Sequence, residues 1–98
     1  MMIKISKSKI ADAEIFIRRS GYGRIFDRRS GQTSYVRRLD RDLYPRFHIY
    51  IEETETDYIF NLHLDQRQTI YEGVSAHSGD YVGTAVEKEV KRISAPAN

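Results

Sequence analysis

The sequence predicts an α+β fold, a two-layer sandwich in which an antiparallel sheet carries both helices on one face. Three observations lead to this expectation. Two runs of alternating apolar and polar residues flank a short polar turn, a second hairpin pattern precedes them, and an apolar stripe with helical spacing lies near each end of the chain. The expected element order is α-β-β-β-β-α. With 98 residues, the chain is expected to form one domain (residues 1–98) around one core.

The first helix is expected from about Lys9 to Arg19. Ser8 is a suitable N-cap, because its hydroxyl can accept a hydrogen bond from a free N–H of the first turn. The Ser20-Gly21 pair is typical of a helix end. The apolar stripe of this helix consists of Ile10, Ala13, Phe16 and Ile17.

The first hairpin is expected to pair residues 24–28 with residues 33–39. The connecting residues Arg29-Ser30-Gly31-Gln32 place glycine where a left-handed turn residue is useful. The inward face of these strands stays open, because Ile25 and Phe26 are adjacent apolar residues. Residues 40–45 are expected to connect this hairpin to the third strand.

The second hairpin, between Arg46 and Gln66, has the most regular pattern in the chain. A turn closed by Thr54 and Asp57 sets a register that unites the apolar residues on one face. Phe47 then lies opposite Leu64, Ile49 opposite Leu62, and Ile51 opposite Phe60. On the other face His48 lies opposite His63 and Tyr50 opposite Asn61, so two of the three histidines are expected side by side.

The last helix is expected to begin at Thr84, because Thr84 and Glu87 have the spacing of a capping box. Val86, Val90 and Ile93 form its apolar stripe. The preceding segment, residues 66–83, is expected to be a loop longer than compact domains usually contain, which is typical of functional or disordered segments.

Composition narrows the class of protein. No apolar run approaches the roughly 20 residues that span a bilayer, and the first seven residues turn polar too early for a secretory signal. The absence of cysteine excludes disulfides and thiolate zinc sites. We therefore expect a cytoplasmic protein with no cofactor and no membrane partner.

Charge is segregated along the chain. Residues 18–46 contain nine arginines and three aspartates, a net charge of +6, whereas residues 47–98 contain four cations and nine acids, a net charge of −5. Arginine binds phosphates in a bidentate way, and basic patches with aromatic residues are typical of nucleic-acid binding. The alternative is that these arginines pair with the acidic second half. The candidate nucleic-acid-binding residues are Arg28, Arg29, Arg37, Arg38, Arg41, Arg46 and Tyr50.

The histidines have three competing interpretations. His48 and His63 have the chemistry of a general acid and base for RNA cleavage, with arginines near the phosphate. Alternatively, His48, His63 and His77, with Asp65, have the chemistry of a transition-metal site. In the third interpretation the histidines are exposed strand residues without a chemical role.

The order of motifs resembles that of the HicA-type toxins, small mRNA-cleaving partners of antitoxins with a double-stranded-RNA-binding-like α-β-β-β-α fold. The matching motifs are Ser20-Gly21-Tyr22, the histidine in Arg46-Phe47-His48-Ile49-Tyr50, and Gly83-Thr84 before the last helix. The resemblance implies a catalytic role for His48. The chain departs from the family at Arg46-Phe47, where these toxins have Gly-Ser before the histidine.

We therefore expect a domain that binds RNA or another polyanion through its arginine-rich hairpin and exposed sheet face, with histidine-dependent ribonuclease activity as a further hypothesis. The alternative is a non-catalytic module that docks a protein partner on the open face. Tyr50, Ile59 and Tyr71 are the candidate anchors in that case, since aromatic residues dominate interface hot spots.

Overall fold

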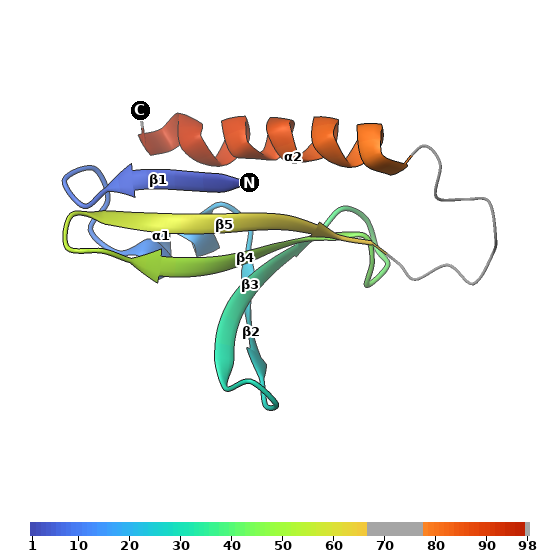
Figure 1. Ribbon diagram of the computed structural model, residues 1–98, viewed down its shortest axis with the longest axis horizontal. Helices are drawn as coiled ribbons and strands as arrows, with labels where there is room; N and C mark the ends of the chain where they lie inside the picture. Colours follow the sequence, from blue (N-terminus) through green and yellow to red (C-terminus); the bar gives the residue numbers. More distant parts are fainter. Residues whose placement is uncertain (67–77, 98) are drawn as a thin grey trace.

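A computed structural model describes residues 1–66 and 78–97. In this part of the chain, a five-stranded antiparallel sheet of order β1-β5-β4-β3-β2 packs against two α-helices, so the predicted α+β class is confirmed (Figure 1). The elements are β1 (Met2–Ser6), α1 (Ala13–Arg19), β2 (Gly23–Asp27), β3 (Gln32–Arg38), β4 (Arg46–Glu53), β5 (Asp57–Asp65), α2 (Ser78–Ser94) and the short 3-10 helix η2 (Ala95–Ala97).

The first strand was not predicted. β1 pairs with β5 and buries Ile3 and Ile5, whereas Met2 and Lys4 are exposed. Only two of its five residues face the core, too few to stand out as an alternating pattern. The element order is therefore β-α-β-β-β-β-α, and the expected α-β-β-β-β-α order is wrong at its start.

The first helix begins four residues later than expected. Asp12, not Ser8, is its N-cap and accepts a hydrogen bond from the backbone N–H of Ile15 (2.9 Å). The Ser8 hydroxyl bonds to that of Ser6 instead (2.9 Å). The predicted end is confirmed, since Gly21 follows the helix with a φ of 100°, a conformation that favours glycine.

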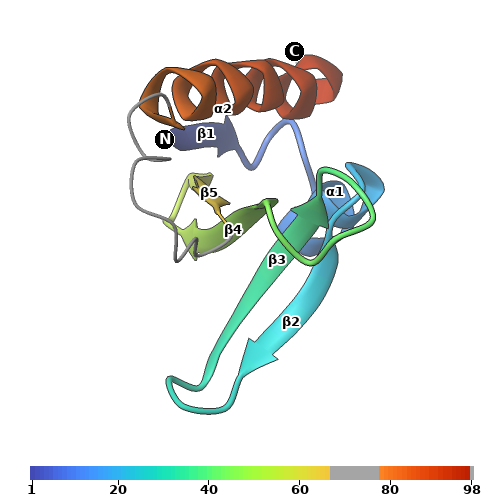
Figure 2. The ribbon, with the colours of Figure 1, turned by 90° about the vertical axis from the view of Figure 1, so that its right-hand side faces the viewer.

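Both predicted hairpins form, although β2 and β3 each begin and end one residue earlier than expected. The β2–β3 hairpin turns at Gly31, whose φ is 72°. The tip of this hairpin projects away from the rest of the molecule (Figures 1 and 2). The β4–β5 hairpin has the predicted register at every pair, including His48 with His63. The alternation is regular enough there to exclude a slip of one residue.

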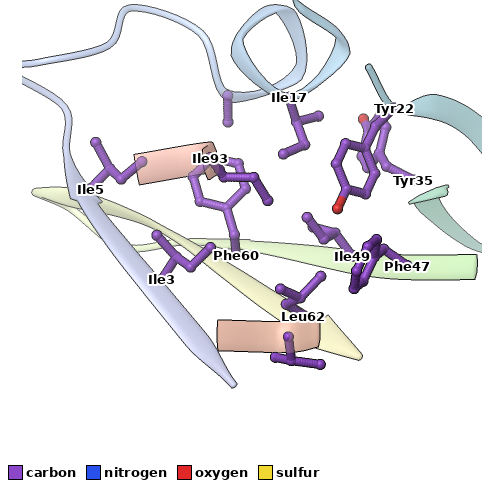
Figure 3. Close-up of a cluster of buried hydrophobic side chains, with 12 residues drawn as sticks. Ile3, Ile5, Ile17, Tyr22, Tyr35, Phe47, Ile49, Phe60, Leu62 and Ile93 are labelled. Carbon is purple, nitrogen blue, oxygen red and sulfur yellow. The ribbon is translucent and has the colours of Figure 1, made fainter. Parts of the chain in front are cut away.

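Both helices cover the same face of the sheet, as expected. Figure 3 shows Ile17 of α1 and Ile93 of α2 gathered with Phe60 and Ile49 of the central strands. These four side chains are fully buried. The core therefore lies between the two helices and β1, β5 and β4. The opposite face of the sheet, called the helix-free face below, carries His48, Tyr50, Asn61 and His63.

The last helix begins before the predicted start. α2 starts at Ser78, so Thr84 and Glu87 lie inside the helix and the predicted capping box is wrong. Gly83 inside the helix costs only about 1 kcal/mol, which the rest of a 17-residue helix can offset. The predicted stripe is confirmed, with Val86 and Ile93 buried.

The last part of the predicted loop (residues 66–83) is helical, because α2 begins at Ser78. Residues 67–77 lie outside the described part of the chain. Among the described residues, no helix is long and apolar enough to cross a membrane.

Candidate nucleic-acid interface

His48 and His63 occupy the predicted positions on the helix-free face, but their surroundings differ. His48 lies on β4 with a side chain only 12% exposed, and His63 lies opposite it on β5 and is exposed. The two histidines are register partners, and neither is buried in the helix-covered core. The geometry on which a site at this face depends is therefore present.

The ring of His48 is held at both nitrogens. Its Nδ1 lies 2.8 Å from Oδ2 of Asp65 on β5, and its Nε2 lies 2.7 Å from Oγ of Ser34 on β3. An ionised carboxylate only accepts hydrogen bonds, so Nδ1 donates to Asp65, and Nε2 forms a second hydrogen bond with the Ser34 hydroxyl. The result is a chain of side chains that links three neighbouring strands, called the Ser34–His48–Asp65 chain below.

This chain has the order of a serine-histidine-aspartate triad, but Ser34 is only 3% exposed. A nucleophile must reach its substrate, and a hydroxyl at this depth on a central strand has little access. The arrangement fixes the orientation of His48 and ties β3 to β5 across β4. We therefore assign the Ser34–His48–Asp65 chain a structural role.

Arg46 extends the same network. Its Nε donates to Oδ2 of Asp65 (3.3 Å), and its guanidinium lies over the ring of Tyr44, 4.6 Å from the centroid. The side chain of Arg46 is only 18% exposed, so most of its contacts are within the protein. Asp65 thus holds both an arginine and a histidine.

The predicted metal set does not assemble among the described residues. In residues 1–66 and 78–97, no group of three histidine, cysteine, aspartate or glutamate side chains is placed to hold a metal ion. His77, the third histidine of that hypothesis, lies outside the described residues.

Tyr50 lies beside both histidines, one step along the helix-free face. Its ring centroid lies 4.6 Å from that of His48 and 6.1 Å from that of His63, which it meets edge to face at 68°. We call this group of three rings on the helix-free face the aromatic row. Because His48 is fixed by Ser34 and Asp65, Tyr50 packs against a rigid neighbour. Flat rings held this way are suited to stacking against planar ligands.

The predicted arginines divide into two groups. Arg37 points to the helix-covered face and pairs with Glu89 (3.0 Å), and Arg46 pairs with Asp65; these two follow the alternative in which arginines pair with the acidic half. The other four are exposed and have no ion-pair partner among the described residues. They are Arg28 and Arg29 at the hairpin tip, Arg38 at the end of β3 and Arg41 in the β3–β4 connection.

A buried carboxylate, missed by the sequence analysis, explains the position of Arg37. The side chain of Glu89 on α2 is 2% exposed and accepts hydrogen bonds from Arg37 (3.0 and 3.1 Å), Arg92 (2.7 and 3.0 Å) and the hydroxyl of Tyr22 (2.6 Å). We call this group the Glu89 cluster. A signal existed, since Glu89 lies at helical spacing between Val86 and Ile93 on the apolar stripe.

The groups around Glu89 stabilise its ionised form. Burial alone raises the pKa of a carboxyl group, but the hydrogen bonds from Arg92, Arg37 and Tyr22 outweigh it and lower the pKa of Glu89 to about 2. Burial and the bond to Glu89 also raise the pKa of the Tyr22 hydroxyl. Arg92 further donates to the carbonyl of Ser20 (2.7 Å), which ties α2 to the end of α1.

No protein-family model, curated protein or solved structure matches this chain. The resemblance to HicA-type toxins stays a prediction, and the first strand is one more departure from the helix-first order of that family. What the protein does must therefore be argued from its own surfaces.

Proposed function

We propose that this protein binds single-stranded RNA across the helix-free face of its sheet and along the β2–β3 hairpin. The observation that carries the proposal is that one sheet carries both exposed arginines, which have no ion-pair partner among the described residues, and an aromatic row that includes the exposed His63. Phosphates and unpaired bases are the two parts of a single strand, and each has a matching group on this surface.

The arginines supply the phosphate contacts. Arg28 and Arg29 project at the hairpin tip, and Arg38 lies at the other end of β3. A guanidinium that is not neutralised within the fold keeps its charge and its donors for a phosphate. The β2–β3 hairpin projects beyond the rest of the molecule (Figure 2). An RNA strand could therefore extend along it.

The aromatic row supplies the base contacts. Base–aromatic stacking contributes about 1–3 kcal/mol per base and requires bases that are not already paired. Tyr50 is half-buried, and its side chain lines an open groove on the helix-free face. This requirement for unpaired bases favours a single strand over a duplex.

Binding has stronger support than cleavage. A general base needs a free nitrogen within hydrogen-bond reach of the 2′-hydroxyl, and both nitrogens of His48 are already bonded. His63 is the exposed imidazole of the pair. A histidine-dependent ribonuclease on this face would therefore depend on His63, and loss of RNA cleavage in His63→Ala but not in His48→Ala would identify it.

The experiment that tests binding is fluorescence anisotropy of a labelled single-stranded RNA over a range of salt concentrations. The double variant Arg28→Ala/Arg29→Ala should bind more weakly. Its log–log salt slope should be shallower by about 1.4, since each single-strand phosphate contact contributes about 0.7.

The matched control is Arg18→Ala/Arg19→Ala, which removes the same charge from the exposed surface of α1. It should leave the slope nearly unchanged. The proposal is overturned if single-stranded RNA does not bind at low salt, or if both double variants lower affinity equally. A protein-docking face would give the first of these results.

A further inference from the structure

A groove runs beside the aromatic row, between the outer part of the β2–β3 hairpin and strands β4 and β5. Its volume is about 460 Å³, within the range of roughly 300–1,000 Å³ found for small-ligand sites. Its walls include Gln32, Tyr50, Glu52, Asn61 and His63. Four kinds of chemical group therefore line the groove: an aromatic ring, an imidazole, two side-chain amides and a carboxylate.

Strand register brings the groups of β4 and β5 together. Tyr50 is paired with Asn61, Glu52 lies two residues beyond Tyr50, and His63 lies two residues beyond Asn61. Alternate residues of a strand share a face, so all four side chains stand on the helix-free face. The carboxylate and the amide thus flank the ring on which a planar group would stack.

The carboxylate decides what kind of ligand fits. Glu52 is exposed and has no ion-pair partner among the described residues, so a phosphate in this groove would meet an uncompensated negative charge. An amino group would instead meet an acceptor. The phosphates of a bound strand belong on the hairpin arginines, and the groove suits a base.

We propose that this groove is a subsite for one unpaired nucleobase that bears an exocyclic amino group and that it discriminates against uracil. This inference rests on the proposed RNA binding. The base stacks on Tyr50, its amino group donates to the carboxylate of Glu52, and the amide of Asn61 bonds to a neighbouring edge atom. Carboxylates accept from the amino group of cytosine, and amides bond well to adenine.

Uracil lacks the matching donor. It presents a single N–H between two carbonyl oxygens, so a carboxylate that approaches this edge also meets two acceptors. The discrimination therefore comes from an unfavourable contact with the wrong base as well as a favourable one with the right base.

Oligo(C) and oligo(U) of equal length test this subsite, because the two strands have the same backbone and differ only at the edge of the pyrimidine. By anisotropy at fixed salt, the protein should bind oligo(C) about tenfold more tightly than oligo(U). Glu52→Gln should bring this ratio close to one, because a side-chain amide can donate to the uracil carbonyl as well as accept.

The matched control is Glu53→Gln. Glu53 is the next residue of β4, points to the other face and pairs with Lys7 (2.9 Å). Both variants remove one negative charge and should strengthen RNA binding in general, but Glu53→Gln should leave the C-to-U ratio unchanged. Circular dichroism of each variant verifies that the fold is intact.

The outcomes separate this inference from the proposed function. Binding of both strands with equal affinity, or a C-to-U ratio that Glu52→Gln does not alter, overturns the base subsite and leaves RNA binding in place. No binding of either strand overturns both. A ratio that falls equally in Glu52→Gln and Glu53→Gln also overturns the subsite, because it assigns the effect to net charge.

Discussion

The charged groups on the two faces of the sheet differ in how deeply they are buried and in which elements they connect. On the helix-covered face, the Glu89 carboxylate is 2% exposed and receives hydrogen bonds from Arg37, Arg92 and a tyrosine. On the helix-free face, Asp65 is 31% exposed and holds Arg46 and His48. The first network joins helices to the sheet, whereas the second joins neighbouring strands. The ring of His63 and the arginines outside this second network stay exposed.

Along β3, this difference separates an arginine that stabilises the fold from one that we propose contacts RNA. Arg37 and Arg38 are adjacent on β3, and their side chains leave opposite faces of it. Arg37 is consumed by a buried carboxylate, and Arg38 is exposed. Arg37 on the covered face therefore maintains the fold, whereas Arg38 has no ion-pair partner among the described residues.

The largest effect should follow from Glu89→Ala. Removing this carboxylate leaves Arg37 and Arg92 without their shared acceptor in a largely buried site, and breaking a buried pair costs about 3–5 kcal/mol. Urea denaturation should show this loss as a lower midpoint. The control is Glu87→Ala on the exposed side of the same helix, expected within about 0.5 kcal/mol of the parent protein. Equal losses in the two variants would contradict the comparison.

Acid should weaken the covered face in a defined range. The pKa of Glu89 is about 2 in the folded protein against an ordinary value of 4.5. A lowered pKa stabilises the fold above the ordinary value, and this stabilisation is lost as pH falls from about 4.5 towards 2. The contribution is on the order of 3 kcal/mol.

The measurement is the free energy of unfolding at a series of pH values for the parent protein and for Glu89→Gln. Glutamine does not ionise, so the variant should start less stable at neutral pH and lose less stability across this acidic range. A variant that follows the same acid curve as the parent protein would show that other carboxylates cause the loss.

Single substitutions of the adjacent arginines sharpen the comparison directly. Arg37→Ala should lower the free energy of unfolding by about 2 kcal/mol, since it removes charge-assisted bonds to Glu89 while Arg92 remains. Arg38→Ala should change stability by less than about 0.5 kcal/mol and should weaken RNA binding. Denaturation and anisotropy on the same two samples provide the check. Reversed effects would mean that the assignment of faces to functions is wrong.

How far the sequence could predict this structure depended on the range of the interactions involved. The β4–β5 register was predictable because six consecutive pairs, from Arg46–Asp65 to Ile51–Phe60, alternate between polar and apolar. β1 was missed because its only signal is Ile3 and Ile5, and its partner lies more than fifty residues away. A short strand of this kind is recognisable only once its partner exists.

The site was predictable to the level of the face but not of the contacts. Alternation placed His48 and His63 side by side, whereas the bonds of His48 to Ser34 and Asp65 depend on the β3–β4 pairing, whose inward face the sequence left open. The opposite fates of Arg37 and Arg38 have the same origin. Two identical neighbours can be told apart only when the strand has a defined face.

The smallest effect we expect concerns Ser34. Ser34→Ala removes the hydroxyl that bonds to Nε2 of His48, a hydrogen bond worth about 1 kcal/mol. In a double-mutant cycle with His48→Ala, the two losses should fall short of additivity by a similar amount. RNA binding should not change, because Tyr50 and His63 keep their places. Nitrogen chemical shifts should place the proton of His48 on Nδ1, since Asp65 still accepts from it. Strict additivity, or a parent protein without a proton on Nδ1, would mean that the Ser34–His48–Asp65 chain does not join these strands. The aromatic row would then lack the rigid neighbour on which its use as a stacking surface depends.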